Sequence, residues 1–176
     1  MARARVRPAT ERDLDLLIRH RRRMFEDMGY DEPAILDRFE PFYRRWARQR
    51  LRSGRLVAFI VEDPSQGAVA SGCVWLQEFL PNPGRRSQRV PYLMSMYTEP
   101  KARKKGHARR IVREAIRWCR QNGHSRMFLH ASSMGRGLYR EFGFERTWQM
   151  RLRLLPGRPA RARSRKRRPL RPAKRG

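Results

Sequence analysis

Residues 96–110 combine side chains and spacing that suit the binding of a phosphate group. This stretch, MYTEPKARKKGHARR, runs from an apolar segment through Pro100 and a basic segment into an amphipathic one. A loop that enters a helix presents unpaired backbone N–H groups, and the helix dipole favours an anion there. Gly106 allows a close approach of the backbone or a positive φ angle. The stretch therefore predicts a pyrophosphate site, to which basic side chains add charge (Arg103, Lys104, Lys105 and Arg109).

The pattern in this loop is R-x-x-G-x-A, formed by Arg103, Gly106 and Ala108. It is neither the G-x-x-x-x-G-K-[ST] of a P-loop nor the G-x-G-x-x-G of a dinucleotide-binding fold. A basic turn that caps a surface helix would show the same short pattern. A second motif, L-Y-x-x-F-G-F from Leu138 to Phe144, follows one helix and one strand later and makes the interpretation more specific.

Taken together, a strand, Pro100, the R-x-x-G-x-A loop, a helix, a strand and L-Y-x-x-F-G-F resemble the GNAT superfamily of acyl-CoA N-acyltransferases. The sequence LHASSMGRGLYREFGF is especially similar to that of small bacterial members. The resemblance is strongest over residues 93–154 and extends over 1–155. It implies an α/β (α+β) fold with a mixed, twisted central sheet of about six to seven strands flanked by helices.

The resemblance also implies acetyl-CoA as co-substrate and indicates which residues would contact it. The pantetheine arm would lie along the backbone of Met96, Tyr97 and Thr98, in the manner of an added strand. The pyrophosphate would lie on the basic loop (Arg103, Lys104, Lys105, Gly106, His107, Ala108 and Arg109). Tyr139 would lie near the cofactor sulfur as the catalytic residue. Ser132 occupies a cofactor-binding position at which family members often carry asparagine.

The chemistry of such a transfer places its own demands on the site. Amide formation from a thioester requires a neutral amine, whereas an alkyl amine with a pKa of about 10.4 is protonated at neutral pH. A base or a water path must remove a proton, and a fixed backbone N–H should stabilise the oxyanion. We expect a primary amine of an unidentified small molecule or protein to attack directly in a ternary complex, with Tyr139 as proton donor. The base stays open among several carboxylates (Glu26, Asp27, Glu78 and Glu99).

The elements that must position these residues follow from the hydrophobic periodicity. We expect strands over residues 6–8, 55–61, 68–79, 90–98, 126–131 and 147–154, and helices over about 11–25, 34–52, 107–120 and 134–142. One face of the first helix carries Leu14, Leu17, Ile18, Arg21 and Phe25. Pro41 should break or kink the second helix, whose aromatic residues are expected to border the acceptor site (Phe42, Tyr43 and Trp46). His20 is expected to be exposed.

The charge of the chain is strongly positive and unevenly distributed. The 176 residues include 43 Lys+Arg and 16 Asp+Glu, which gives a net charge of +27. Residues 156–176 contain ten basic side chains, no acidic one and a single large apolar residue, so we expect a disordered tail after a domain of residues 1–155. The excess of arginine reflects either biased composition or an affinity for polyanions.

The composition also excludes several classes of protein. Two cysteines, Cys73 and Cys119, exclude a disulfide scaffold, and neither has the spacing of a metal site. The longest apolar run, Leu56–Val61, is far shorter than the about 20 residues of a membrane span. We therefore expect a cytoplasmic protein without a metal or a membrane partner, for which a homodimer is compatible with the resemblance. Two alternatives stay open: a protein that binds RNA or DNA as a polyanion, weakly through its tail, and a non-catalytic acyl-CoA-binding protein.

Overall fold

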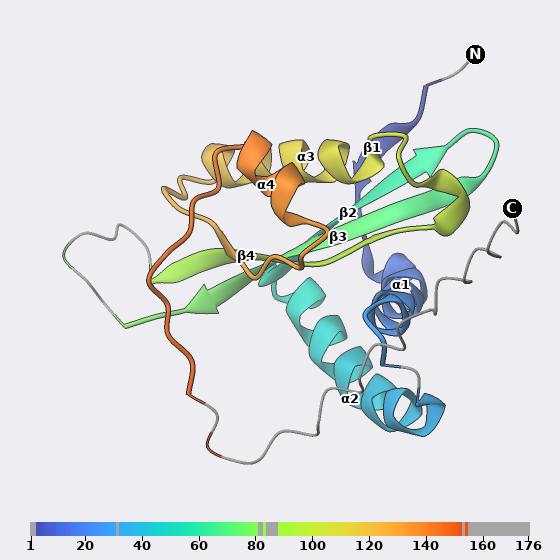
Figure 1. The fold of residues 1–176 in the computed structure, drawn as a ribbon, viewed down its shortest axis with the longest axis horizontal. Helices are drawn as coiled ribbons and strands as arrows, with labels where there is room; N and C mark the ends of the chain where they lie inside the picture. The colour runs from blue at the N-terminus through green and yellow to red at the C-terminus, as the bar shows by residue number, and fades with distance from the viewer. Residues whose placement is uncertain (1–2, 31, 81–82, 84–87, 153, 155–176) are drawn as a thin grey trace, which may run out of the picture. The chain divides into compact units, whose positions relative to one another are not determined.

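The fold is built on one five-stranded sheet with the order β1-β2-β3-β4-β5 (Figure 1). The computed structural model describes residues 3–30, 32–80, 83, 88–152 and 154. The first four strands pair antiparallel, whereas β4 and β5 pair parallel. The sheet is therefore mixed, as expected. The strands are β1 (Arg5–Pro8), β2 (Leu56–Asp63), β3 (Gly67–Glu78), β4 (Arg89–Thr98) and β5 (Phe128–Leu129).

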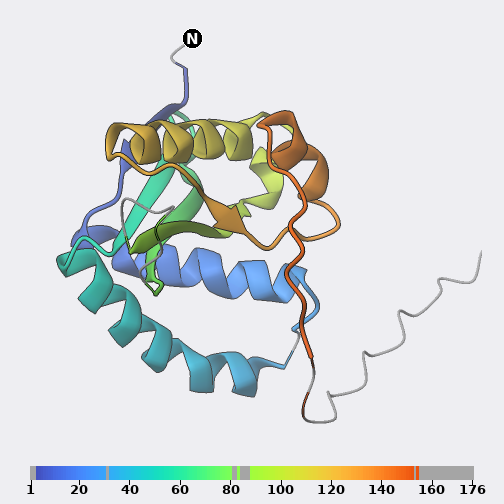
Figure 2. The ribbon, with the colours of Figure 1, turned by 90° about the vertical axis from the view of Figure 1, so that its left-hand side faces the viewer.

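Helices cover both faces of the sheet (Figure 2). α1 and α2 lie on one face and α3 on the other, and each side has its own apolar core. Because both faces are buried, β2 and β3 read as nearly continuous apolar runs. The helices are α1 (Leu14–Asp27), α2 (Pro33–Arg52), α3 (His107–Gln121) and α4 (Arg136–Glu141), with short 3-10 turns at η1 (Glu11–Asp13) and η2 (Pro100–Ala102).

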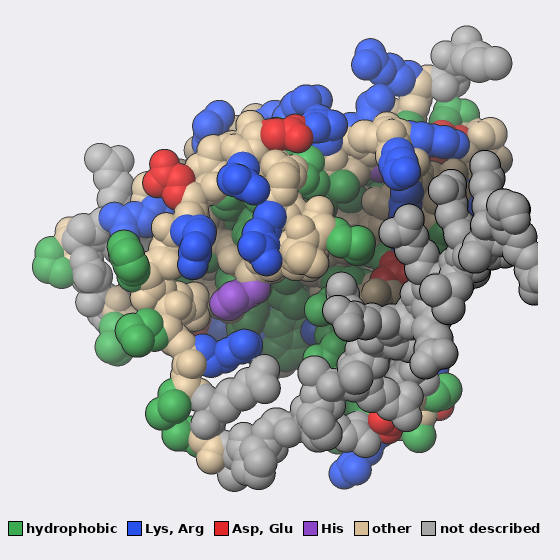
Figure 3. Space-filling view, viewed as in Figure 1, with side chains coloured by type: hydrophobic (Ala, Val, Ile, Leu, Met, Phe, Trp, Pro, Cys, Tyr) green, Lys and Arg blue, Asp and Glu red, His purple; other side chains and the backbone are tan. Residues whose placement is uncertain are grey.

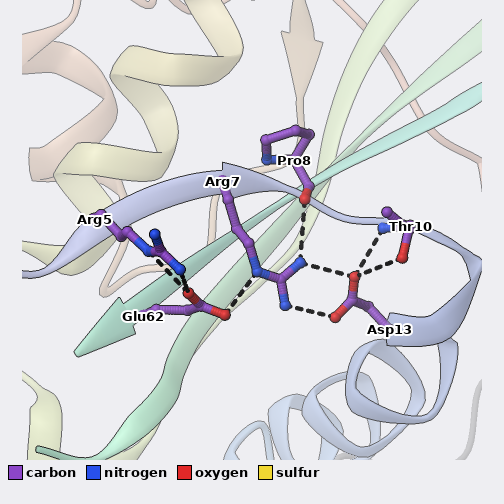
Figure 4. Close-up of polar contacts among 6 residues, drawn as sticks. All are labelled: Arg5, Arg7, Pro8, Thr10, Asp13 and Glu62. Atoms are coloured by element: carbon purple, nitrogen blue, oxygen red, sulfur yellow. Dashed lines mark hydrogen bonds and ion pairs between the residues drawn. The ribbon is translucent and has the colours of Figure 1, made fainter. Parts of the chain in front are cut away.

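An ion-pair network fixes the edge strand β1 and the start of α1 (Figure 4). The guanidinium group of Arg7 binds the Glu62 carboxylate at 2.7 Å and the Asp13 carboxylate at 2.7 Å. Asp13 also accepts a hydrogen bond of 2.8 Å from the backbone N–H of Thr10. These contacts lower the pKa of Asp13 to about 2, and the hydrogen bond from Arg7 has the largest effect. The network ties residues far apart in the sequence to one another at the sheet edge.

The sheet has fewer strands than the six to seven expected from the sequence. Within residues 145–152 and 154 the structure has no strand, although the alternation of apolar residues there predicts one. A strand needs a hydrogen-bonded neighbour as well as an alternating sequence, and β1 to β5 supply none to these residues. β5 also has only two residues, instead of the six expected for residues 126–131.

The structure bears on two further local expectations, a break or kink at Pro41 and an exposed His20. Pro41 lies inside α2, which continues from Pro33 to Arg52 without a break. A proline in a helix removes one N–H donor and bends the helix, and α2 is visibly curved in Figure 2. His20 is fully buried rather than exposed. Its Nδ1 atom lies 2.9 Å from Ser71 Oγ, because α1 packs directly on the sheet.

The contacts divide the chain into two units, Met1–Phe144 and Glu145–Gly176. The expected tail of residues 156–176 lies outside the described residues. The boundary at 155 therefore stays a prediction. Across the described part of the chain, no helix is both long and apolar enough to cross a membrane.

Candidate active site

The parallel pairing of β4 with β5 ends in the middle of β4. The two strands pair only at Tyr92 with Phe128 and at Leu93 with Leu129. Beyond Leu93, β4 continues to Thr98. On the edge that faces away from β3, these residues pair with no strand among the described residues. Apart from the Thr98 carbonyl, which accepts a hydrogen bond from Arg103, the N–H and C=O groups of this edge are consequently available for pairing with an extended ligand. The expected pantetheine-binding residues, Met96, Tyr97 and Thr98, lie on this part of the strand.

A β-bulge in β4 lies at the same point. Ser71 pairs with Tyr97 and Cys73 with Met94, so that one residue of β3 faces two of β4. Ser95 in the bulge has a φ angle of 53°, which is uncommon for a residue other than glycine. Opposite the bulge, a Cβ atom on Gly72 would lie 2.4 Å from Met96 Sδ. Any larger residue at position 72 would therefore clash with the side chain of Met96, which packs over β3 at this point.

The remaining side chains of this edge point to opposite faces of the sheet. Tyr97 is buried against the ring of His20, and its hydroxyl donates a hydrogen bond of 3.3 Å to Glu99. The Thr98 carbonyl accepts a hydrogen bond of 3.0 Å from Arg103 Nε. Burial raises the pKa of Tyr97. Tyr97 thus anchors the end of β4 to α1 through its side chain, and its backbone belongs to the free edge of β4.

The basic loop after β4 has the backbone geometry that the sequence predicts. Gly106, the N-cap of α3, has a φ angle of 78°, and Lys104 has one of 63°. The first N–H groups of α3 lack acceptors within the helix. Arg103 binds Asp27 at 2.5 Å, and Arg109 binds Glu141. In the described part of the chain, Lys104 and Lys105 form no ion pair, so these two carry the uncompensated charge of the loop.

His107 and Ala108 open α3 at the end of the loop. His107 is only 4% exposed, and neither of its ring nitrogens has a hydrogen-bond partner among the described residues. Burial and the neighbouring Arg110 lower the pKa of the ring. Because a neutral, buried imidazole is a poor anion ligand, His107 and Ala108 can contact a phosphate best through their backbone N–H groups. Lys and Arg side chains are spread over the surface that carries α3 and α4 (Figure 3).

Tyr139 and Ser132 come together at Gly135. Ser132 Oγ accepts a hydrogen bond of 3.2 Å from the Gly135 N–H, and a Cβ atom on Gly135 would lie 2.9 Å from the Tyr139 ring. Tyr139 also packs edge-on against Phe144. Burial raises the pKa of Tyr139, so the phenol retains its proton at neutral pH and can donate it.

A cavity of about 580 Å³ opens between α1, α2 and the sheet. Its wall includes Phe25, Phe42, Tyr43, Trp46, Trp75 and Met94. The three aromatic residues expected at the acceptor site, Phe42, Tyr43 and Trp46, are thus brought together here. Each of the four carboxylates considered as bases forms an ion pair with an arginine. The pairs are Glu26 with Arg22, Asp27 with Arg103, Glu78 with Arg55 and Glu99 with Arg23. No group of three or more His, Cys, Asp or Glu suited to a metal occurs in the described ranges.

Sequence reasoning missed three residues of this region: Gly72, Ser95 and Arg21. Arg21 lines the cavity, and its Nη1 atom donates a hydrogen bond of 2.6 Å to Ser95 Oγ. One signal for Arg21 was present, since it is the only charged residue on the apolar face of the first helix (Leu14, Leu17, Ile18, Arg21 and Phe25). The bulge at Ser95 has no comparable signal, because serine rarely adopts a positive φ angle.

The family model described as an acetyltransferase (GNAT) domain matches residues 5–147. The chain belongs to the GNAT acetyltransferase family. As a member of this family it is an acetyl-CoA-dependent N-acetyltransferase, and acetyl-CoA is its co-substrate. A comparison with curated proteins gives no match.

Solved structures show the same fold in other GNAT proteins. A GCN5-related N-acetyltransferase from Ralstonia eutropha JMP134 is 25% identical, with a TM-score of 0.77 over 86% of this chain and 99% of the other. A protein from Clostridium acetobutylicum, described as a predicted acetyltransferase and solved with acetyl-CoA, is 26% identical, with a TM-score of 0.77 over 86% and 97%. The aminoglycoside acetyltransferase AAC(6')-Iy, at 19% identity and a TM-score of 0.62 over 89% and 99%, shares the fold.

The residues of this GNAT acetyltransferase fit the co-substrate. The free edge of β4 from Met94 to Thr98 suits an extended amide-bearing arm. The start of α3, with Gly106 in the left-handed region and Lys104 and Lys105 beside it, suits a pyrophosphate.

Proposed function

We propose that this GNAT acetyltransferase transfers the acetyl group to a primary amine by direct attack in a ternary complex. One observation carries the proposal. The pairing of β4 with β5 ends beside the bulge at Ser95, and the free edge of β4 that follows leads to the start of α3. The cavity between α1, α2 and the sheet is lined in part by Met94 of β4 and provides room for an acceptor.

The proposed roles follow from where the residues lie. The backbone of Met96, Tyr97 and Thr98 would pair with the pantetheine arm, and a fixed N–H beside the bulge would stabilise negative charge on the carbonyl oxygen. The loop would bind the pyrophosphate (Arg103, Lys104, Lys105, Gly106, His107, Ala108 and Arg109). When bound, acetyl-CoA supplies a thioester that is activated toward amines. Tyr139 would donate a proton to the departing sulfur, and Ser132 would support the turn before α4 on which Tyr139 lies.

The test is a calorimetric titration of acetyl-CoA into the full chain and into two glycine variants. Gly106→Asp places a negative charge at the N-terminal end of α3, where the pyrophosphate is proposed to bind, at a φ angle of 78°. Gly123→Asp places the same charge beyond the other end of α3, at a φ angle of 74° and equally in open space. Both variants carry similar backbone strain, so they differ mainly in where the charge lies.

We expect binding by the parent and by Gly123→Asp, and a loss of at least about tenfold in affinity for Gly106→Asp, since charge-assisted hydrogen bonds contribute about 1.5–3 kcal/mol. Equal affinity of the two variants would contradict the proposed pyrophosphate site. The comparisons give no support to the alternatives of polyanion binding and non-catalytic acyl-CoA binding. The tail on which the first alternative rests lies outside the described residues.

A further inference from the structure

Aromatic side chains form half of the lining of the cavity between α1, α2 and the sheet, and among the described residues Arg21 is the cation in this lining that has no acidic partner. Its volume of about 580 Å³ falls within the about 300–1,000 Å³ of small-molecule sites. The guanidinium group of Arg21 lies 4.3 Å from the centre of the Tyr43 ring and 4.8 Å from that of Phe25. No carboxylate among the described residues forms an ion pair with Arg21.

The position of Arg21 is fixed by its contacts rather than left to solvent. The hydrogen bond of 2.6 Å to Ser95 Oγ holds Arg21 beside the β4 bulge. The rings of Phe25 and Tyr43 pack against its guanidinium group. A guanidinium group has five N–H donors in a rigid fork that matches the two oxygens of a carboxylate. One of these donors is used by Ser95, which leaves others for a ligand in the cavity.

The other charges at the cavity are balanced. Arg22 binds Asp37 at 2.5 Å and Glu26 at 3.2 Å. Glu40, the acidic residue in the cavity wall, lies 3.6 Å from both Arg22 and Arg44. Among the described residues that line the cavity, the charge of Arg21 is therefore the one that no carboxylate balances. The buried hydroxyl of Tyr43, which forms no hydrogen bond among the described residues, adds a second polar group to the same wall.

We propose that the acceptor is an α-amino acid with an aromatic or large aliphatic side chain, whose carboxylate binds Arg21 and whose side chain fills the aromatic cavity. The inference rests on the proposed function. A carboxylate on Arg21 would be beside Ser95, so the adjacent α-amine would lie next to the bulge where acetyl transfer is proposed. A polycationic acceptor such as an aminoglycoside would instead bring positive charge against Arg21.

The reaction balances without a further reactant. The amine nitrogen forms a bond to the acetyl carbon, and the bond between this carbon and sulfur breaks with its electron pair going to sulfur. Of the two protons that the ammonium group loses, one goes to the sulfur and the other to solvent. The products are the N-acetylamino acid and free coenzyme A.

The experiment follows thiol release by the full chain with acetyl-CoA and four amines. L-phenylalanine carries both features, phenylalaninamide lacks the carboxylate, glycine lacks the apolar side chain, and kanamycin is a polycation. Both cysteines of the chain are buried and do not interfere with a thiol reagent (Cys73 and Cys119). The variants are Arg21→Met, Arg21→Lys and, as a matched loss of charge on the exposed side of α2, Arg48→Met.

We expect phenylalanine to be the best acceptor by kcat/KM. Arg21→Met should lower this value about 10- to 100-fold, in line with a charge-assisted hydrogen bond. The value for phenylalaninamide should change little, Arg21→Lys should retain part of the activity, and Arg48→Met should match the parent. The affinity for acetyl-CoA should be the same in all variants, which separates loss of the carboxylate contact from loss of the fold.

A second readout does not depend on turnover. Trp46 and Trp75 line the cavity, so N-acetylphenylalanine should quench tryptophan fluorescence in the parent and much less in Arg21→Met. Preference for the amide over the acid, equal losses for both in Arg21→Met, or no quenching would overturn the inference. Acetylation of kanamycin alone would overturn it and leave the proposed function standing. Absence of acetyl-CoA binding would refute the proposed function itself.

Discussion

Gly72 connects the packing of the sheet to the proposed acetyl-CoA site, and Gly72→Ala tests this connection. The residue lies on β3 opposite the bulge of β4. A Cβ atom there would lie 2.4 Å from Met96 Sδ and 2.7 Å from Ile111 Cγ2. Real Cβ contacts are longer, so at least one of these side chains must move. Ile111 is fully buried on α3 and cannot move away without displacing the helix, whereas Met96 is flexible.

The cost follows from overpacking a filled interior, which is about 1–3 kcal/mol. For a chain of this size each kcal/mol lowers Tm by about 2–4 °C. We therefore expect Gly72→Ala to unfold about 2–12 °C below the parent in a calorimetric scan. Because the displaced Met96 belongs to the free edge of β4, the affinity for acetyl-CoA should fall as well.

Two further variants separate this mechanism from a general effect of alanine. Gly137→Ala adds a Cβ atom in open space on α4 and should be neutral or slightly stabilising. Met96→Ala combined with Gly72→Ala should recover part of the lost Tm, because it removes the shorter of the two contacts. The reasoning is refuted if Gly72→Ala unfolds at the temperature of the parent, or if the double variant loses the sum of the single losses.

Other perturbations test the remaining groups. Tyr139→Phe should lower kcat about 3- to 10-fold with an unchanged KM for acetyl-CoA, because a thiolate leaves without full protonation; an unchanged kcat would show that Tyr139 only packs. Burial lowers the pKa of His20 to about 4, so the unfolded chain binds its proton first, and stability measured by urea unfolding should fall as pH decreases from about 6.5 towards 4. His20→Gln should remove this phase. Asp13, with its pKa lowered to about 2 by Arg7, contributes stability above pH of about 4 that is lost towards pH 2, and Asp13→Asn should flatten that second phase.

Much of the fold could be predicted from the sequence because its signals are local. The apolar stripe of α3 predicts a helix, and its members Ile111, Val112, Ala115 and Cys119 are all buried. Gly106 occupies the left-handed position that the loop requires. The order of strand, basic loop and helix, together with the L-Y-x-x-F-G-F motif, was therefore sufficient to predict the family, its co-substrate and the loop proposed to bind the pyrophosphate.

The errors occur where an element depends on a distant neighbour. The alternation over residues 147–154 predicts a strand, but periodicity indicates only which side chains would share a face. Whether a strand forms depends on a partner that accepts and donates its backbone hydrogen bonds. His20 was expected to be exposed, yet it is buried against Ser71, 51 residues away.

By itself, the sequence determined most of the elements, the loop proposed to bind the pyrophosphate and the family, since these are encoded in short patterns of residue type. Only the tertiary structure decided where the acceptor cavity lies and that Arg21 faces it. The contact that fixes Arg21 joins α1 to a bulge 74 residues later in the chain. That bulge exists because β3 and β4 pair with one extra residue in β4. Strand register is a property of two segments together, so no pattern within either segment determines it.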